Sequence, residues 1–376
     1  MAVVLRLIDV QQAVPKYGIY EEKNKVILAL KNLASLLFLL VWSFDVKNIL
    51  VTGAVLRKNG FELGEGKYYG GARLLRLNVE NGGFEKLLSI DKVHCNYPSE
   101  TPNIQFTAGC IDADVLWLPT DTEIRKYSYP CLELLSVFSH TCFNNIHSVT
   151  VRGQFLYVTS TGIDMVVVLD KNTGVIVTKY NAEGKGVWHR FSKSVDYRQM
   201  YSTRPHDCHP NYIFWIKDEP WVTRCTQEDA VSLFDVSKRI DISGPNKEIS
   251  VHDGLVVNND IYFTSVDGCI IKADIETYLV KDIIYLNKMK GFNWVRGWSR
   301  GILIDNNVIY VAFSKLRKTK NLKKLEWLGK FTQKFQILEQ CSILAIDLTT
   351  KTIVNDYIVP EGMIDAIYSI LPEPDA

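Results

Sequence analysis

Two of the seven histidines share a spacing pattern with an arginine and an asparagine, and a third histidine lies close to that asparagine. His147, Asn211, His252 and Arg300 each stand ten residues before a short motif, which consists of an aromatic residue, an apolar residue and usually threonine. His209 lies two residues before Asn211, and an extended chain places such residues on one face. The spacing predicts that these side chains meet at one place in the fold.

Three kinds of chemistry fit this set. His147, His209 and His252 could bind a divalent metal ion (Zn, Fe, Mn or Cu), since neutral imidazole is a common ligand of these ions. Without a metal, Arg300 could bind an anion bidentately while one histidine acts as acid, base or nucleophile. In the third interpretation these polar residues only line a channel and bind ordered water.

Further residues are expected around this set. Asn211 and Asp365 would complete it, Asp365 by matching Ile364-Asp365 to Val251-His252, and Arg224 could reach the rim and contact substrate. The run from His206 to His209 suggests metal ligation, but in an extended segment Cys208 points away from His209. We therefore expect Cys208 to be a core residue.

Internal repeats define the elements that must position these residues. The motif has six copies: Leu50-Val51-Thr52, Trp117-Leu118-Pro119, Tyr157-Val158-Thr159, Trp221-Val222-Thr223, Tyr262-Phe263-Thr264 and Tyr310-Val311-Ala312. Strand-like runs and turns with Asp, Asn and Gly surround most copies, so each unit reads as four antiparallel strands. The sequence predicts an all-β fold, a six-bladed β-propeller. The first strand of each blade should lie innermost, which also places Thr107 at the channel.

The two ends of the chain complete the predicted ring. The first motif copy has no suitable strand before it, whereas residues 364–370 form an apolar run with no blade after it. We expect this carboxyl-terminal strand to be the inner strand of the first blade, which hides both sheet edges. The predicted organisation is an amino-terminal extension (residues 1–47) packed on a propeller (residues 48–376).

Composition limits the compartment and the partners. The chain has 376 residues and a net charge of +1, so no general field attracts nucleic acid, and its eight cysteines are scattered without a Cys-x-x-Cys pair. A cytoplasmic location is expected. Residues 26–44 are mostly apolar and form either an element docked on the propeller, a membrane-surface anchor or a span. Residues 315–334 carry a charge of +7 and could contact an acidic partner, anionic lipid or an anionic substrate, or be a solvated insertion.

Several segments resemble a widespread, functionally uncharacterised bacterial family of β-propeller proteins. They are Cys208-His209 followed by Trp221-Val222-Thr223, His252-Asp253-Gly254, Arg300-Gly301, Asp305-Asn306-Asn307, Ser314-Lys315-Leu316-Arg317, the strand from Cys341 to Asp347-Leu348, and Ile364-Asp365-Ala366-Ile367-Tyr368. The resemblance covers residue 105 to the end and implies the propeller fold, but hardly an activity. A looser likeness is to arylsulfate sulfotransferases, propellers with histidines and an arginine in the channel.

These observations favour an enzyme that acts on a small anionic molecule at the channel mouth. His147, His209 and His252 would bind a metal ion or transfer protons, and Arg300 would orient the substrate, in a lyase, hydrolase or isomerase reaction. One alternative is a metal-free group-transfer enzyme similar to arylsulfate sulfotransferases. Another is a non-catalytic propeller that serves as a scaffold or as a sensor of a ligand.

Overall fold

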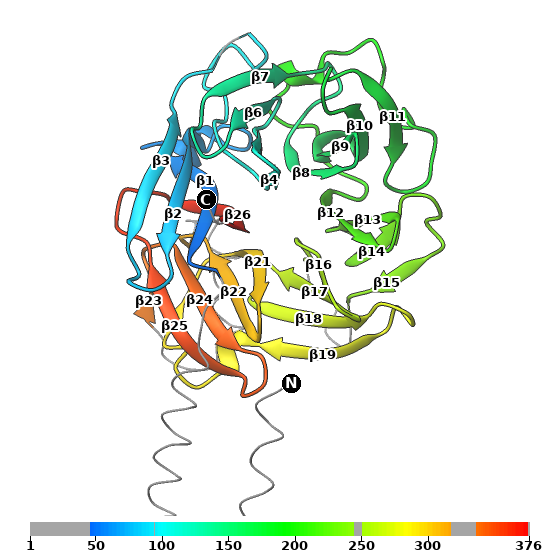
Figure 1. The fold of residues 1–376 in the computed structure, drawn as a ribbon. Coiled ribbons are helices and arrows are strands. Elements are labelled where there is room, and N and C mark those ends of the chain that lie inside the picture. Colours follow the sequence, from blue (N-terminus) through cyan, green and yellow to red (C-terminus); the bar gives the residue numbers. More distant parts are fainter. Residues whose placement is uncertain (1–45, 94, 244–249, 317–335, 375–376) are drawn as a thin grey trace, which may run out of the picture. The chain divides into compact units, whose positions relative to one another are not determined.

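The computed structural model describes residues 46–374 except residues 94, 244–249 and 317–335. In this part of the chain, six four-stranded antiparallel sheets are arranged as blades around a central axis (Figure 1). The predicted six-bladed β-propeller is therefore confirmed. The inner strands begin at one mouth of the central channel and end at the other, because neighbouring inner strands run parallel, as the bridge between Ala108 and Ser148 shows.

The blades follow the chain order, with the inner strand given first in each. They are β26 (Ala366–Pro372), β1 (Asn48–Leu56), β2 (Tyr69–Asn78) and β3 (Phe84–Ile90); β4 (Cys110–Asp112), β5 (Val115–Pro119), β6 (Ile124–Ser128) and β7 (Leu134–Phe138); β8 (Ile146–Arg152), β9 (Phe155–Ser160), β10 (Met165–Asp170) and β11 (Ile176–Asn181); β12 (Pro210–Ile216), β13 (Glu219–Arg224), β14 (Asp229–Ser232) and β15 (Arg239–Asp241); β16 (Leu255–Val257), β17 (Asp260–Ser265), β18 (Cys269–Asp274) and β19 (Val280–Tyr285); β21 (Ser299–Asp305), β22 (Val308–Phe313), β24 (Ser342–Asp347) and β25 (Thr352–Ile358). β20 (Trp294–Val295) pairs with β23 (Gln336–Ile337), and the short helices are α2 (Gly60–Leu63), η2 (Thr161–Ile163), η3 (Tyr197–Gln199) and η4 (Leu286–Lys288).

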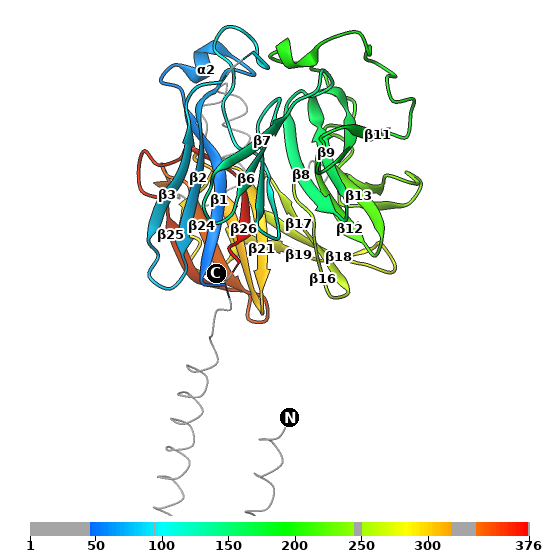
Figure 2. The same ribbon diagram turned by 45° about the horizontal axis from the view of Figure 1, so that its top comes forward.

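The last strand closes the ring, as the sequence predicts. β26 lies on the inside of the first blade and pairs with β1 in an antiparallel register that joins Ile49 to Pro372 and Ala54 to Ala366 (Figures 1 and 2). Because the two strands are more than 300 residues apart in sequence, this pairing closes the ring by backbone hydrogen bonds. Glu373, just beyond β26, also forms an ion pair with Arg76 of β2.

The predicted turns form through the side chains at their first positions. Asp170 accepts hydrogen bonds from the backbone amides of Asn172 and Thr173, and Asp274 accepts them from Glu276 and Thr277 in the same position of another blade. An acidic residue that bonds the backbone two or three residues on stabilises a tight turn. These turns repeat the blade geometry and so keep the inner strands in equivalent positions.

The core lies between adjacent blades. The first residue of the motif is fully buried in several copies, with Trp117 and Trp221 at 1% and 0% exposure and Tyr310 also buried. Trp221 belongs to a cluster that includes Phe214 of its own blade and Phe263 of the next. A fully buried large apolar side chain contributes ~1.5–3 kcal/mol. The motif therefore recurs because every blade must fill the same space against its neighbour.

Two segments with special composition lie outside or mostly outside the described residues. These are the apolar segment 26–44, within the predicted extension, and the basic segment 315–334, of which only residues 315 and 316 are described. The prediction for the domain boundary thus remains a prediction. In the described residues, no helix is long and apolar enough to cross a membrane.

Candidate functional site at the channel mouth

Each of the four residues found by the ten-residue spacing lies at a β-bulge in or just before the inner strand of its blade. The strand pairings shift by one residue around His147 in β8–β9, around Asn211 in β12–β13 and around Arg300 in β21–β22. The bridge of Val251 and the pairing of β16 show the same shift around His252. A bulge leaves one extra residue unpaired and redirects its side chain. The recurring spacing in sequence thus corresponds to a recurring irregularity at the mouth where the inner strands begin.

The threonine of the motif holds these bulges in place. Thr159 accepts a hydrogen bond from Ser148 and donates one to the carbonyl oxygen of Asn211 in the next blade (3.3 Å). Thr223 likewise donates to the carbonyl oxygen of His252 in the blade that follows (2.8 Å). The motif residue of one blade therefore positions the channel residue of the next.

The structure brings the imidazole rings of the predicted histidines together. The ring centre of His147 lies 4.9 Å from that of His209 and 5.7 Å from that of His252. Asn211 stands beside them and donates a hydrogen bond from its amide to Val251 in the next blade (2.8 Å). His147, His252 and Asn211 are buried, whereas His209 is partly exposed. The rings thus extend from the surface of the mouth into the protein.

A fourth histidine, His206, joins this row and was not among the predicted site residues. Its Nδ1 atom lies 2.6 Å from Nδ1 of His209. The ring centres lie 4.8 Å apart, and the ring planes are inclined by 29°. The sequence places His206 in the same short segment as His209, but only the turn at His209, with φ of 53°, brings the two rings together.

Asp164 anchors the segment that carries both of these histidines. Its buried carboxylate accepts hydrogen bonds from the backbone amides of Asp207 (2.9 Å), Cys208 (3.1 Å) and His209 (2.9 Å). Arg190 forms an ion pair with Asp164 and with Asp207. Hydrogen bonds to a charged acceptor are the strong ones. Cys208 itself is fully buried, so it packs as a core residue as its position in the sequence predicts.

Asp253 is a second residue that sequence reasoning did not place in the site. One carboxylate oxygen lies 3.1 Å from Nδ1 of His252, and the other accepts hydrogen bonds from Thr264 (2.5 Å) and from the backbone amide of Gly301 (2.6 Å). Asp253 therefore links His252 to the backbone beside Arg300. In the sequence Asp253 directly follows His252, but the sequence alone does not show that its carboxylate faces the His252 ring.

Arg300 is a buried cation without an acidic partner among the described residues. Its side chain lies over the rings of Trp298 (5.3 Å) and Tyr368 (4.7 Å), and its Nε atom is buried without a hydrogen-bond acceptor. The residue as a whole is 8% exposed. A contact with an aromatic ring stabilises a desolvated cation by about 2 kcal/mol or more. Such contacts do not neutralise the charge.

The surroundings keep the histidines neutral. Burial, followed by repulsion from His209, His252 and Arg300, lowers the pKa of His147 well below its usual value. Burial, followed by repulsion from neighbouring cationic groups, also lowers the pKa of His209 well below its usual value. Burial lowers the pKa of His206 to about 4, and it lowers the pKa of His252 although Asp253 opposes the shift. The imidazoles beside the guanidinium of Arg300 are therefore uncharged at neutral pH.

The pKa of Asp253 is also shifted, to a lower value. Burial alone would raise it, but the contacts with His252, Thr264 and Gly301 hold the pKa of this carboxyl below its usual value. An ionised carboxylate only accepts hydrogen bonds, so Nδ1 of His252 must carry the proton between them. This leaves Nε2 of His252 with a free lone pair, and that atom is buried without a partner.

The register of the last strand corrects one predicted position. β26 shifts its pairing with β1 between Ile367 and Ser369, so the bulge residue of the first blade is Tyr368 and not Asp365. Asp365 instead accepts a hydrogen bond from the backbone amide of Leu56 (2.9 Å) and lies 4.0 Å from the ammonium group of Lys315. The match of Ile364-Asp365 to Val251-His252 was therefore wrong by three residues.

Arg224 also lies in a different environment from the predicted one. Its guanidinium forms a bidentate pair with Asp229 of the neighbouring strand (2.8 and 2.6 Å) and donates to the carbonyl oxygen of Ala182. Both side chains are buried, and this arginine is already paired with a carboxylate of its own sheet and with a carbonyl oxygen of the preceding blade. The structure thus assigns it a role in joining two blades.

The binding of a metal ion by His147, His209 and His252 stays a prediction. Among the described residues, no group of three or more His, Cys, Asp or Glu side chains is arranged to hold one. Of the four imidazoles at this mouth, those of His206 and His209 contact each other through their Nδ1 atoms (2.6 Å), and that of His252 contacts Asp253 through Nδ1. A metal site needs three or four donors that converge on one point.

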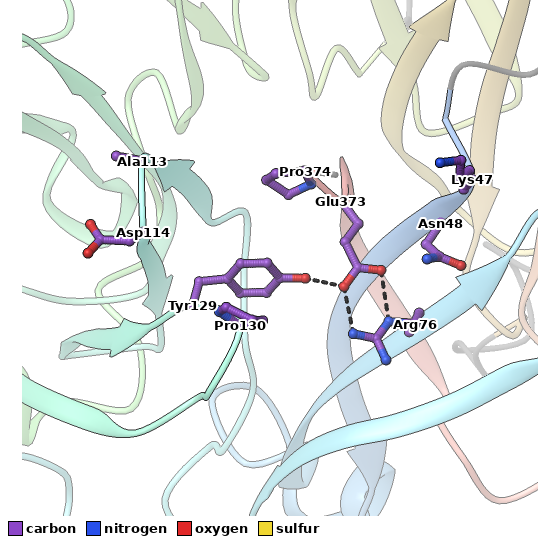
Figure 3. A pocket seen from close by; sticks show the side chains of 9 residues that line it. All are labelled: Lys47, Asn48, Arg76, Ala113, Asp114, Tyr129, Pro130, Glu373 and Pro374. Carbon is purple, nitrogen blue, oxygen red and sulfur yellow. Dashed lines mark hydrogen bonds and ion pairs between the residues drawn. The ribbon is translucent and has the colours of Figure 1, made fainter. Parts of the chain in front are cut away.

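A cavity of about 620 Å³ lies at the opposite mouth, where the inner strands end. Its lining includes Arg76, Tyr129 and Glu373, which form a hydrogen-bonded group between the first two blades (Figure 3). Since Glu373 already binds both Arg76 and Tyr129, its carboxylate supports ring closure. At the histidine mouth, in contrast, the buried guanidinium of Arg300 has no acidic partner among the described residues.

Comparisons with known proteins support the fold alone. No family model and no curated protein matches the chain. Among solved structures, a protein of unknown function from Bacteroides caccae is similar over 87% of this chain and 98% of its own, with 10% identity and a TM-score of 0.53. The WD40 propeller domain of Doa1 is similar over 87% and 86% of the two chains, with 12% identity and a TM-score of 0.47.

Proposed function

We propose that this propeller is an enzyme that binds a small anion at Arg300 and removes a proton from it with His252, without a metal ion. The observation that carries the proposal is the buried guanidinium of Arg300, which has no carboxylate partner among the described residues. An uncompensated buried charge costs about 3–5 kcal/mol in analogous cases. A bound anion would offset that cost.

The neighbouring residues supply what a general base needs. His252 presents the free lone pair of Nε2, and Asp253 fixes the tautomer through Nδ1, an arrangement in which a base is oriented by a third group. The lowered pKa of His252 keeps this base unprotonated at neutral pH. His147 and Asn211 lie beside it, so they would contact the substrate.

The experiment is a calorimetric titration of sulfate into the whole protein. Replacing Arg300 with glutamine should weaken binding by at least about 10-fold, because a hydrogen bond to a charged group contributes ~1.5–3 kcal/mol. The control is Arg152→Gln, which removes the same charge from an exposed arginine paired with Asp218. Affinity should change little between pH 8 and pH 6, because the lowered histidine pKa values keep the imidazoles neutral.

Two outcomes would contradict the proposal. If Arg300→Gln and Arg152→Gln bind sulfate equally well, Arg300 is not the anion site. If affinity rises steeply on acidification to pH 6, protonated histidines bind the anion, and His252 is not a free base at neutral pH.

A further inference from the structure

We infer that the substrate is an anion that carries a hydroxyl group, such as a hydroxycarboxylate, because two imidazole nitrogens of the site can only accept hydrogen bonds. This inference rests on the proposed function, since it names the class of molecule that Arg300 would bind. It follows from the proton positions that the hydrogen-bond network imposes on His206, His209 and His252.

The proton position on His206 follows from Thr203. The hydroxyl group of Thr203 donates its hydrogen bond to the carbonyl oxygen of Gly162. Its oxygen can therefore only accept from Nε2 of His206, which lies 3.4 Å away. A neutral imidazole carries one proton. Nδ1 of His206 is thus the unprotonated nitrogen.

The proton position on His209 follows from that of His206. Because Nδ1 of His206 has a lone pair, the hydrogen bond of 2.6 Å between the two rings needs its proton on Nδ1 of His209. The lowered pKa values exclude an additional proton on either ring at neutral pH. Nε2 of His209 then carries no proton and can only accept a hydrogen bond.

His252 also carries its proton on Nδ1, and a separate set of hydrogen bonds fixes it there. Asp253 holds the proton on Nδ1, and Nε2 is buried without a donor. Arg300 can only donate hydrogen bonds, and it acts electrostatically on both of these histidines. The site thus offers a cation for an acidic group and two lone pairs for hydrogen-bond donors.

A substrate that matches these groups needs a charge and donors on the same small molecule. A simple carboxylate would satisfy Arg300 but leave the buried Nε2 atom of His252 without a donor, which is unfavourable. A site built to bind a substrate hydroxyl rejects the analogue that lacks it. A hydroxycarboxylate would satisfy Arg300 with its carboxylate and His252 or His209 with its hydroxyl group.

Calorimetric titration with matched pairs of ligands tests this inference. At pH 7.5 the whole protein should bind glycolate at least about 10-fold more tightly than acetate, and lactate more tightly than propionate. In His209→Phe, which changes a partly exposed residue, the glycolate preference should fall severalfold while acetate binding stays within about 3-fold. Equal affinity for glycolate and acetate would overturn the hydroxyl inference and leave the anion site intact. Failure of all these ligands and of sulfate to bind would instead overturn the proposed function.

A second measurement needs no ligand. Nitrogen-15 spectra of protein labelled at histidine distinguish the two neutral tautomers of each ring. His209 and His252 should both carry their proton on Nδ1 at pH 7.5, and His206 should carry it on Nε2. A proton on Nε2 of His209 or His252 would overturn the inference even if the protein binds anions.

Discussion

Asp253 shows how one side chain can set the chemistry of a neighbouring ring. It contacts Nδ1 of His252 with one oxygen and binds Thr264 and the amide of Gly301 with the other. In the blades before it, the equivalent threonines Thr159 and Thr223 donate to the backbone of the next blade. In this blade the Asp253 carboxylate joins Thr264 to the backbone of the next blade, and it also fixes the proton position on the His252 ring.

Replacing Asp253 with asparagine should reverse the tautomer of His252. The amide group can donate to Nδ1, which would move the ring proton to Nε2 and remove the lone pair that acts as base. General acid–base catalysis contributes about 10²–10⁴-fold, so a loss of this size is expected in any reaction that uses His252. The change itself is measured by nitrogen-15 spectra of labelled protein.

The control for this change is Asp218→Asn, since Asp218 is an exposed aspartate paired with Arg152. It should leave the spectrum of His252 unchanged. If Asp253→Asn keeps the proton on Nδ1, the carboxylate does not set the tautomer, and the role assigned to Asp253 is wrong.

At the level of elements, the site depends on bulged inner strands and on one anchored segment. The spacing of ten residues predicts His147, Asn211, His252 and Arg300 correctly as equivalent positions, because each inner strand and its motif are joined by one short turn. The same count was impossible for the last strand, whose partner β1 lies at the other end of the chain. Asp365 was therefore chosen in place of Tyr368.

Other features of the site depend on contacts that spacing cannot show. The partner of Arg224 is Asp229 on the next strand, and the anchor of His209 is Asp164, which is 45 residues away. Both contacts depend on side-chain directions in three dimensions. The fold could be predicted from repeated turns and motifs, whereas proton positions and ion pairs needed the structure.

Asp164→Asn should loosen the segment that holds His206 and His209. Asparagine tolerates the left-handed conformation of Asp164, with φ of 53°. Its single neutral oxygen can replace the acceptor of Cys208 and His209 only more weakly, and its NH2 group cannot accept the hydrogen bond that Asp207 donates to the other carboxylate oxygen. The free energy of unfolding should fall by about 1–3 kcal/mol. The amides of Asp207, Cys208 and His209 should exchange faster in hydrogen-exchange measurements.

The matched control is Asp170→Asn in the same blade, because Asp170 begins an exposed turn in which asparagine can make the same backbone contacts. It should leave the exchange of residues 207–209 unchanged. Equal exchange of these amides in Asp164→Asn and in the unmodified protein would show that Asp164 does not hold the segment.

In the whole molecule, ring closure assembles one site from residues of several blades. His147, His209, His252 and Arg300 come from the third to the sixth blades, and Tyr368, which lies under Arg300, comes from the strand that closes the first. The net charge of the chain is only +1. At the histidine mouth, however, the guanidinium of Arg300 has no acidic partner among the described residues and lies beside uncharged imidazoles. The two mouths also differ, because the opposite one carries the ion pair of Arg76 and Glu373 that secures closure.

The most direct test of the central claim, that Arg300 and the imidazoles form one anion site, is a crystal structure of the whole protein with glycolate. The account predicts the glycolate carboxylate within hydrogen-bond distance of the Arg300 guanidinium and its hydroxyl group at Nε2 of His252 or His209. The account would be contradicted by a structure in which Arg300 pairs with a carboxylate of the protein, or in which glycolate binds elsewhere and leaves this mouth unchanged.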